Sequence, residues 1–339
     1  MATTSLLELK TVTKIFGGRK EFTVALDDMT FALQENFPRI ITVAGESGSG
    51  KTTMMMLLLG FYFPTVGQVL YEGKDLKTLN RHEMMSYRRY IQAVFQDPFA
   101  VYNPFYKVDN LLSIPIKNFK LAKSKREART LMEEALSRVG LRPEETLGRF
   151  PHQLSGGQRQ RIAVARALLL KPKLLIADEP VSMVDASLRS TILKSLRALN
   201  QDYNVPILYI THDLTTAYHV SDYIMILYHG SVMEAGNVDK IIRDPQHPYT
   251  QLLVNSIPWP DPNLKWGNAE EMISQSKAAF TGAQGCKFTT RCPKAHDICY
   301  TARPELFAHE DDRAVACFLF KDAPVVPREE FGTLFEETA

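Results

Sequence analysis

The chain lacks cysteine in its first 285 residues, lacks a long hydrophobic run and carries little net charge. All four cysteines lie between Cys286 and Cys317, which favours a local metal or redox feature over the scattered disulfides of a secreted protein. The longest apolar run, MMMLLLGFYF, has ten residues and is too short to cross a bilayer. The opening MATTSLLELK has no basic segment before an apolar run and indicates no secretion signal. We therefore expect any membrane role to depend on a partner protein.

The formal charge of +2 is spread along 339 residues, so it gives no reason to expect binding to nucleic acid or acidic lipid. The composition, 45% apolar and 23% charged, is that of a soluble protein with an ample core. The length allows one large domain and a smaller appendage.

A glycine-rich loop follows the apolar β-type run at 40–43 and precedes the helical run TTMMMLLLG. From Gly45 to Thr52 it matches GxxxxGKS/T, in the strand–loop–helix order of a phosphate loop. Such a loop points consecutive backbone N–H groups at one anion, while Lys51 reaches the outer phosphates and Thr52 offers its hydroxyl to Mg²⁺. The sequence therefore predicts that the chain binds a nucleoside triphosphate. The expected contacts are Gly45, Glu46, Ser47, Gly48, Ser49, Gly50, Lys51, Thr52 and Thr53.

Two carboxylates end the buried strand predicted at 174–177, where α/β sheets place their ligands. We expect Asp178 to support Mg²⁺ through water and Glu179 to polarise the attacking water as general base. Gln96 and His212 each follow a further strand-like run. A parallel sheet would bring both side chains beside the γ-phosphate.

A second glycine motif, LSGGQ at 154–158, precedes another helical run. A helix N-cap at Ser155 would explain where this helix starts, but not why the chain has two phosphate-type loops. Together, GESGSGKT, VFQDP, LSGGQ, LLIADEP, SMVD and ITHD resemble in order and spacing the motifs of ABC-type ATPases, over about residues 5–235.

That resemblance implies an α/β fold, with a P-loop ABC-type ATPase core, an N-terminal antiparallel β subdomain and a helical subdomain. It also implies ATP with Mg²⁺ as the nucleotide, and a head-to-tail dimer in which the LSGGQ loop covers the ATP of the other subunit. The residues expected to contact that ATP are Ser155, Gly156, Gly157, Gln158 and Asp185.

Further roles follow from the same resemblance. Gln96 would sense Mg²⁺ and move with the helical subdomain, and His212 would hold the γ-phosphate and orient Glu179 and water. The motif SMVD differs from the commoner SALD by exchanges between apolar residues. We expect ATP hydrolysis to be kept, but the difference puts communication between the two ATP sites in doubt. Adenine would stack on Phe16, with Phe22 as the rival.

We expect the cassette at 1–235, with its helical subdomain at about 99–160, and a C-terminal extension at 236–339. Apolar residues recur at helical spacing from Ala128 to Val139, and Gly140 closes that helix. Aromatic residues after Gln96 either line a groove for a helix of the membrane subunit or pack the subdomains together. They are Phe99, Tyr102, Phe105 and Tyr106.

The extension carries HPYTQLL, SIP and four cysteines spaced C-x5-C-x6-C-x17-C. This spacing lacks the C-x2-C knuckles of most zinc sites, whereas four thiolates can enclose a 4Fe-4S cluster. The tail resembles that of ATPase subunits of oligopeptide/dipeptide-type ABC importers, some of which carry such a cluster. Zinc, disulfides or free thiols are the alternatives. The candidate ligands are Cys286, Cys292, Cys299 and Cys317.

The resemblance predicts an ATPase at the cytoplasmic face of the cell membrane that powers import of peptides or similar solutes, including oligosaccharides. Its expected partners are two integral-membrane permease subunits, a second ABC ATPase subunit (identical or paralogous) and, indirectly, an extracellular solute-binding protein. The alternative is a soluble ABC-type ATPase acting on nucleic acid or the ribosome. The single cassette, the weak charge and the importer-like tail argue against that alternative, so no nucleic-acid partner is expected.

Overall fold

The computed structural model describes most of the chain. The described residues are 5–18, 21–34, 38–97, 102–182, 184, 186–257, 284–310 and 312–335. The chain divides into two compact units. Unit 1 comprises 1–34, 41–77 and 211–339, and unit 2 comprises 35–40 and 78–210.

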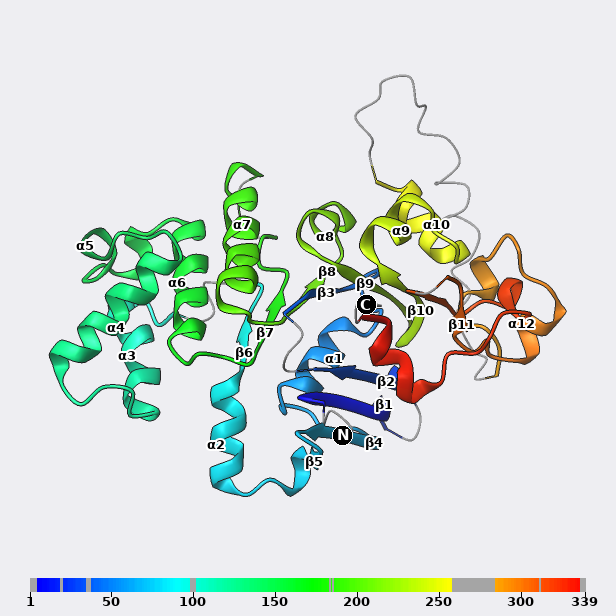
Figure 1. Cartoon of the computed structure of the whole chain (residues 1–339), viewed down its shortest axis with the longest axis horizontal. Helices are drawn as coiled ribbons and strands as arrows, with labels where there is room; N and C mark the ends of the chain where they lie inside the picture. The colour runs from blue at the N-terminus through cyan, green and yellow to red at the C-terminus, as the bar shows by residue number, and fades with distance from the viewer. Residues whose placement is uncertain are drawn as a thin grey trace. The chain divides into compact units, whose positions relative to one another are not determined.

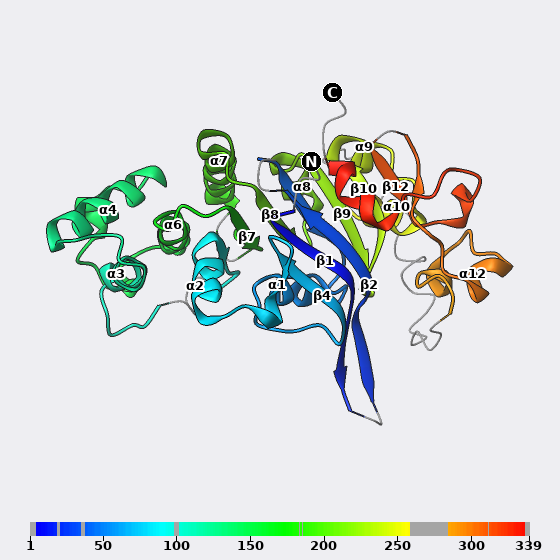
Figure 2. The same ribbon diagram turned by 60° about the horizontal axis from the view of Figure 1, so that its bottom comes forward.

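The N-terminal part of unit 1 is an antiparallel sheet, as the resemblance implies. In spatial order its strands are β2 (Phe22–Leu33), β1 (Leu7–Gly17), β4 (Val66–Tyr71) and β5 (Lys74–Asp75). Figure 2 shows β1 and β2 running side by side. Leu7 and Leu9 of β1 and Phe31 of β2 are buried, so one face of this sheet belongs to the core.

A second group of strands in unit 1 contains parallel and antiparallel pairs. In spatial order they are β11 (Phe307–Ala308), β12 (Arg313–Val315), β10 (Ser231–Asn237), β9 (Tyr223–Tyr228) and β3 (Ile40–Ala44). β3 and β9 pair in parallel, and the other pairs are antiparallel. Every residue of β3 and β9 is buried, which explains why these segments are continuous apolar runs without alternation.

Short helices complete unit 1. They are α1 (Lys51–Leu58), η1 (Leu76–Thr78), α8 (Leu214–Val220), α9 (Val238–Arg243), α10 (Pro248–Asn255), η3 (Thr289–Arg291), α12 (Asp297–Thr301), η4 (Phe318–Phe320) and η5 (Arg328–Phe335). Side chains of α8, α9 and α10 share one buried cluster with β9 and β10. Figure 1 shows these three helices on one side of the two strands, with α1 and the antiparallel sheet on the other.

Unit 2 combines parallel strands with helices. The strands are β6 (Ile91–Val94), β7 (Leu174–Asp178) and β8 (Ile207–Thr211), in this spatial order. The helices are α2 (Arg81–Tyr90), α3 (Val108–Asn118), α4 (Lys125–Arg138), α5 (Pro143–Thr146), η2 (Pro151–Gln153), α6 (Gly156–Leu168) and α7 (Ala186–Tyr203).

Helix α4 confirms the helix predicted from the apolar spacing. Met132, Ala135 and Leu136 form its buried stripe, and Ser124 caps its N-terminus by accepting from the backbone N–H of Glu127. Gly140 follows with a φ of 69°, the left-handed conformation that ends many helices. Over the parts of the chain that the structure describes, no helix has the length and hydrophobicity needed to cross a lipid bilayer.

The described part of the chain after residue 236, here called the tail, packs against β2. Phe331 and Phe335 of η5 place their rings 6.5 and 5.7 Å from the ring of Phe31. All three side chains are almost fully buried. An aromatic cluster of this size contributes several kcal/mol, about 3–5 kcal/mol per large side chain removed.

Ion pairs join the tail to the same strand. One carboxylate oxygen of Asp27 forms ion pairs with Lys287 Nζ at 2.9 Å and with Arg303 Nη1 at 2.8 Å. The neighbouring Asp28 pairs with Arg328 at the start of η5. The first pair is nearly buried, whereas the side chains of Arg328 and Asp28 are 49% and 39% exposed.

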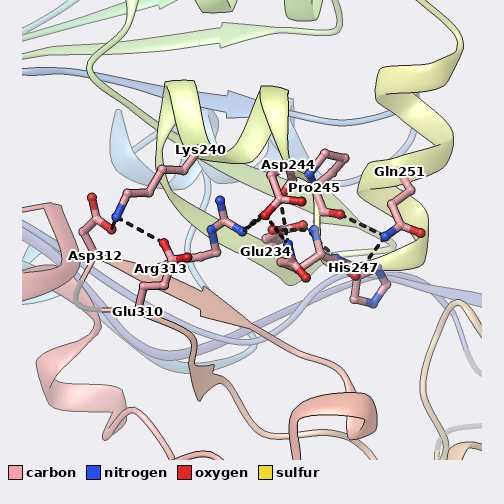
Figure 3. Close-up of polar contacts among 10 residues, drawn as sticks. Glu234, Lys240, Asp244, Pro245, His247, Gln251, Glu310, Asp312 and Arg313 are labelled. Atoms are coloured by element: carbon pink, nitrogen blue, oxygen red, sulfur yellow. Dashed lines mark hydrogen bonds and ion pairs between the residues drawn. The ribbon is translucent and has the colours of Figure 1, made fainter.

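The turn before α10 is fixed by a buried carboxylate (Figure 3). Glu234 of β10 accepts hydrogen bonds from the backbone N–H groups of Gln246 and His247, both at 3.0 Å. His247 is the N-cap of α10, and its Nδ1 accepts from the backbone N–H of Tyr249 at 3.0 Å. Acceptance at Nδ1 requires a neutral imidazole with its proton on Nε2.

His247 makes this turn sensitive to acid. Burial lowers the pKa of His247 from 6.5 to about 3, against an opposing hydrogen bond with the backbone of Ala316. Below about pH 6.5 the unfolded chain therefore takes up a proton that the folded chain refuses, so stability falls as the pH falls from about 6.5 towards 3. The slope contributed is about 1.4 kcal/mol per pH unit.

We predict that His247→Asn, which keeps a side-chain acceptor at the N-cap, removes this slope. Urea unfolding of parent and variant at pH 7, 6 and 5 measures it. The stability difference between parent and variant should shift in favour of the variant at pH 5. Parallel pH profiles for the two proteins would show that His247 is not the group responsible.

Candidate nucleotide-binding and hydrolysis site

The predicted phosphate loop lies in unit 1, between the end of β3 and the start of α1. Gly45, Gly48 and Gly50 have φ values of 148°, 80° and 106°, which residues with a Cβ rarely adopt. A Cβ at Gly45 would lie 2.2 Å from the carbonyl oxygen of Leu227, and one at Gly50 would lie 2.5 Å from that of Ala25. The loop therefore requires glycine at both positions.

The ammonium of Lys51 lies against the loop itself. Its Nζ donates to the carbonyl oxygens of Gly45 at 2.7 Å and Glu46 at 2.8 Å, and is 3.3 Å from Ser49 Oγ. Thr52, at the second position of α1, is exposed. The loop thus carries a positive charge at a helix N-terminus, an arrangement that suits an anion.

Glu46, beside the phosphate loop's first glycine, contacts the tail. Arg291 Nη1 and Nη2 donate to its two carboxylate oxygens at 2.9 and 3.0 Å. Its backbone N–H donates to the hydroxyl of Tyr249 at 3.0 Å. Sequence reasoning assigned no role to Arg291 or Tyr249, because the partners are 245 and 203 residues apart and no local pattern joins them.

In unit 2, two of the predicted catalytic side chains are in contact. Gln96 Nε2 donates to Glu179 Oε2 at 2.9 Å. Glu179 follows Asp178 at the end of β7, and its backbone N–H donates to Ile210 O at 2.8 Å. Glu179 has a φ of 41°, a conformation that non-glycine residues adopt at a cost of about 1–3 kcal/mol and that is often found at functional sites.

The LSGGQ segment forms the start of α6. Ser155 is the N-cap: its Oγ accepts from the backbone N–H of Gln158 at 3.2 Å, and Gln158 Oε1 accepts from the backbone N–H of Ser155 at 2.9 Å. Ser155 is exposed, Gly156 is partly buried and Gly157 is buried. The expected N-cap is therefore present, on a serine that remains accessible.

His212 and the candidate adenine contacts lie in unit 1. His212 follows β8 and is exposed. Phe16 stands edge-on to Tyr62, with ring centroids 5.4 Å apart, and Lys14 Nζ lies 5.1 Å from the Phe16 ring. Phe16 is 36% exposed and Phe22 is 69% exposed, so each presents ring surface. The choice between them stays a prediction.

Asp185, Met183 and Phe99 lie outside the described residues. Of the other aromatic residues after Gln96, Tyr102 donates its hydroxyl to Arg159 O at 2.7 Å, a contact within the expected helical subdomain, so the choice between the groove and the packing role stays a prediction. Phe105 is 86% exposed.

The four cysteines line one small cavity of about 10 Å³, together with His296 and Phe288. All four are free thiols. Burial raises the pKa of Cys286, Cys292 and Cys317, that of Cys317 to about 11, so these thiols stay protonated unless a cation compensates the thiolate. Among the described residues, no three or more histidine, cysteine, aspartate or glutamate side chains are arranged to hold a metal ion. The thiols therefore gather at one place without forming the expected ligand set.

Two known protein families match separate segments of this chain. Residues 26–182 match the family "ABC transporter", and residues 233–299 match "Oligopeptide/dipeptide transporter, C-terminal region". The putative oligopeptide transport ATP-binding protein YkfD of Bacillus subtilis is 38% identical over 321 residues, which cover 94% of this chain and 96% of YkfD. The oligopeptide transport ATP-binding protein AppF of the same organism is 37% identical over 328 residues, covering 93% and 98%.

Solved structures share the fold. A dimeric post-hydrolysis state of the ATP-binding cassette MJ0796 bound to ADP and Pi has a TM-score of 0.60 at 30% identity, covering 68% of this chain and 98% of that one. CbiO1 of Clostridium perfringens, part of the ABC transporter complex cbiONQ, has a TM-score of 0.62 at 26% identity, covering 71% and 92%. The α/β cassette fold expected from the motifs is confirmed, and the chain belongs to the ATP-hydrolysing subunits of ABC transporters that carry the oligopeptide/dipeptide transporter C-terminal region.

Proposed function

We propose that this chain hydrolyses ATP to power the import of peptides or similar solutes, such as oligosaccharides, through a membrane permease. The observation that carries this proposal is the similarity over nearly the whole chain, including the tail, to proteins named for oligopeptide transport. The competing function, action on nucleic acid or the ribosome, has no comparable support.

The proposed chemistry assigns one task to each side chain. The phosphate loop and Lys51 bind the phosphates of ATP, and Thr52 and Asp178 hold the accompanying Mg²⁺. Glu179 acts as general base on the attacking water, Gln96 senses the metal and His212 holds the γ-phosphate. The contact between Gln96 and Glu179 supports this assignment, because it places the amide of the proposed metal sensor within hydrogen-bond distance of the carboxylate of the proposed base.

We further propose that the cassette acts as a head-to-tail pair. Ser155, Gly156, Gly157, Gln158 and Asp185 would then contact the ATP bound by the partner subunit. The start of α6 supports this, because its N-cap Ser155 is exposed and the N-terminal N–H groups and positive dipole end of a helix suit an anion. The dimeric cassette MJ0796 provides a structural precedent for pairing.

In this proposal residues 1–235 form the cassette, with its helical subdomain at about 99–160, and residues 236–339 form the extension. The partners are two permease subunits, a second ATPase subunit that is identical or paralogous, and indirectly an extracellular solute-binding protein. The chain would act at the cytoplasmic face of the cell membrane.

Glu179→Gln should lower ATP turnover by at least about 100-fold, because the amide cannot accept the proton of the attacking water. ATP binding should persist, so ATP-bound dimers should accumulate, which size-exclusion chromatography with ATP and Mg²⁺ measures. Lys51→Ala is the matched control, since it should lose turnover without dimer accumulation. Turnover of Glu179→Gln at the rate of the parent would disprove the role as base.

Purification of the chain from gently solubilised native membranes should carry along two polytopic membrane proteins, identified by mass spectrometry. A second ATPase in the same sample would establish a heterodimer. Recovery instead with ribosomal proteins or DNA-repair factors in the soluble fraction would overturn the importer function and favour the competing one.

We also propose that Cys286, Cys292, Cys299 and Cys317 hold a 4Fe-4S cluster, with zinc as the alternative. The donor chemistry fits, because four thiolates supply one ligand for each iron and all four line the same cavity. The cavity of about 10 Å³ has room for about one water, so the side chains would have to move apart. When bound, such a group cross-links a loop-rich segment and orders it.

Purification without oxygen, followed by elemental analysis, should find about four irons and four sulfides per chain. Cys292→Ser should lower that content severalfold, whereas Lys294→Ala, at the same cavity, should leave it unchanged. About one zinc per chain would select the alternative. Neither metal, together with four thiols that react freely, would disprove a metal site.

A further inference from the structure

All polar groups of Glu46 have partners, and those partners join the tail to the phosphate-binding lysine. The backbone N–H donates to Tyr249, and the carboxylate accepts two hydrogen bonds from Arg291. The carbonyl oxygen accepts from Lys51 Nζ at 2.8 Å and from the backbone N–H of Ser49 at 3.1 Å. Glu46 therefore links the tail, through Tyr249 and Arg291, to Lys51 of the phosphate loop.

Arg291 makes further contacts within unit 1. Its guanidinium carbon lies 5.7 Å from the ring centroids of both Tyr228 and Phe288, and Nη1 is 3.4 Å from the Tyr228 hydroxyl. The side chains of Arg291 and Glu46 are 17% and 37% exposed, so water screens their pair only partly. The hydrogen bonds to Glu46 raise the pKa of Arg291, which keeps the guanidinium charged. A two-point arginine–carboxylate contact fixes orientation as well as distance.

Tyr249 is fully buried, and its ring packs against Tyr228 and Phe288 with centroid separations of 4.5 and 5.3 Å. Burial raises the pKa of Tyr249, so its hydroxyl stays neutral and accepts the N–H of Glu46 without introducing a charge. The backbone N–H of Glu46 therefore has its hydrogen-bond acceptor in the tail.

The turn that carries Tyr249 is anchored at both sides (Figure 3). Glu234 binds the backbone N–H groups of Gln246 and His247, and Arg313 Nη1 donates to Asp244 O at 2.9 Å. Glu234 and Arg313 are both buried. The turn before Tyr249 is therefore anchored by hydrogen bonds with buried side chains, as a residue that positions another one requires.

We infer that Arg291 and Tyr249 are positioning residues for nucleotide binding. By binding Glu46, they fix the position of the loop carbonyl groups to which the Lys51 ammonium donates. This inference rests on the phosphate-binding role proposed for Lys51. It assigns to the tail a part in ATP affinity, exerted through Glu46, in addition to any part in transporter assembly.

The test uses the full-length chain with Arg291→Gln, Tyr249→Phe and Glu46→Gln. The Kd for a fluorescent ATP analogue with Mg²⁺, and the KM for ATP, should each rise roughly fivefold, as for a network that acts through one intermediate residue. The kcat should change by less than about twofold, because the hydrolytic side chains are untouched. The double variant Arg291→Gln/Glu46→Gln should bind ATP as the single variants do, because both remove the same contact.

Arg328→Gln is the matched control. It breaks another arginine–carboxylate pair between the tail and the rest of unit 1, with Asp28 as the partner, and it does not touch the phosphate loop. Its Kd should equal that of the parent. An unchanged Kd in Arg291→Gln, or an equal rise in Arg328→Gln, would overturn the inference, since the latter would reflect tail docking in general.

One further variant, Lys51→Ala, separates the inference from the proposed function on which it rests. Lys51→Ala should abolish binding; if it binds ATP as the parent does, the phosphate role of Lys51 fails and the inference falls with it. Loss of binding in Lys51→Ala with parental binding in Arg291→Gln would overturn the inference alone. Should Arg291→Gln not fold, Glu46→Gln decides, because its partly exposed side chain can lose its charge without leaving a buried cavity.

Discussion

At the phosphate loop, backbone segments of unit 1 meet with no room for side chains between them. A Cβ on Gly50 would lie 2.5 Å from Ala25 O, and one on Gly230 would meet the same oxygen at the same distance. Hydrogen bonds run from Gly230 N to Ser49 O at 2.8 Å and from Asp27 N to Gly230 O at 3.0 Å. The loop, the turn between β9 and β10, and β2 therefore form one backbone junction. The position of the antiparallel sheet, and of the tail that docks on it, depends on this junction.

Local chemistry made much of the molecule predictable. Glycines with positive φ, an N-cap serine and an apolar stripe of period 3.6 each act within a few residues, so the phosphate loop, the start of α6 and helix α4 could be placed from the sequence. Two of the parallel strands were predictable for a related reason: burial on both faces leaves an uninterrupted apolar run, as in β3 and β7.

Contacts between distant segments were not predictable, because no periodicity links their residues. The hydrogen bonds of Glu46 with Tyr249 and Arg291 span more than 200 positions. The HPY segment could be noted as a family feature, yet its tyrosine has no visible reason to be near a phosphate loop. The cysteine spacing predicted a shared site and the four side chains do share a cavity, but spacing alone does not state how far apart the thiols stand.

The packing of η5 against β2 also affects the order in which the protein can fold during its synthesis. Phe31 leaves the ribosome about 300 residues before Phe331, which at about 5–20 residues per second is a delay of roughly 15 to 60 s. During that interval the aromatic face of β2 has no cover from η5. Such late, long-range closure slows folding and leaves apolar surface exposed until the tail has been made. The antiparallel sheet is thus among the first parts translated and among the last to be completed.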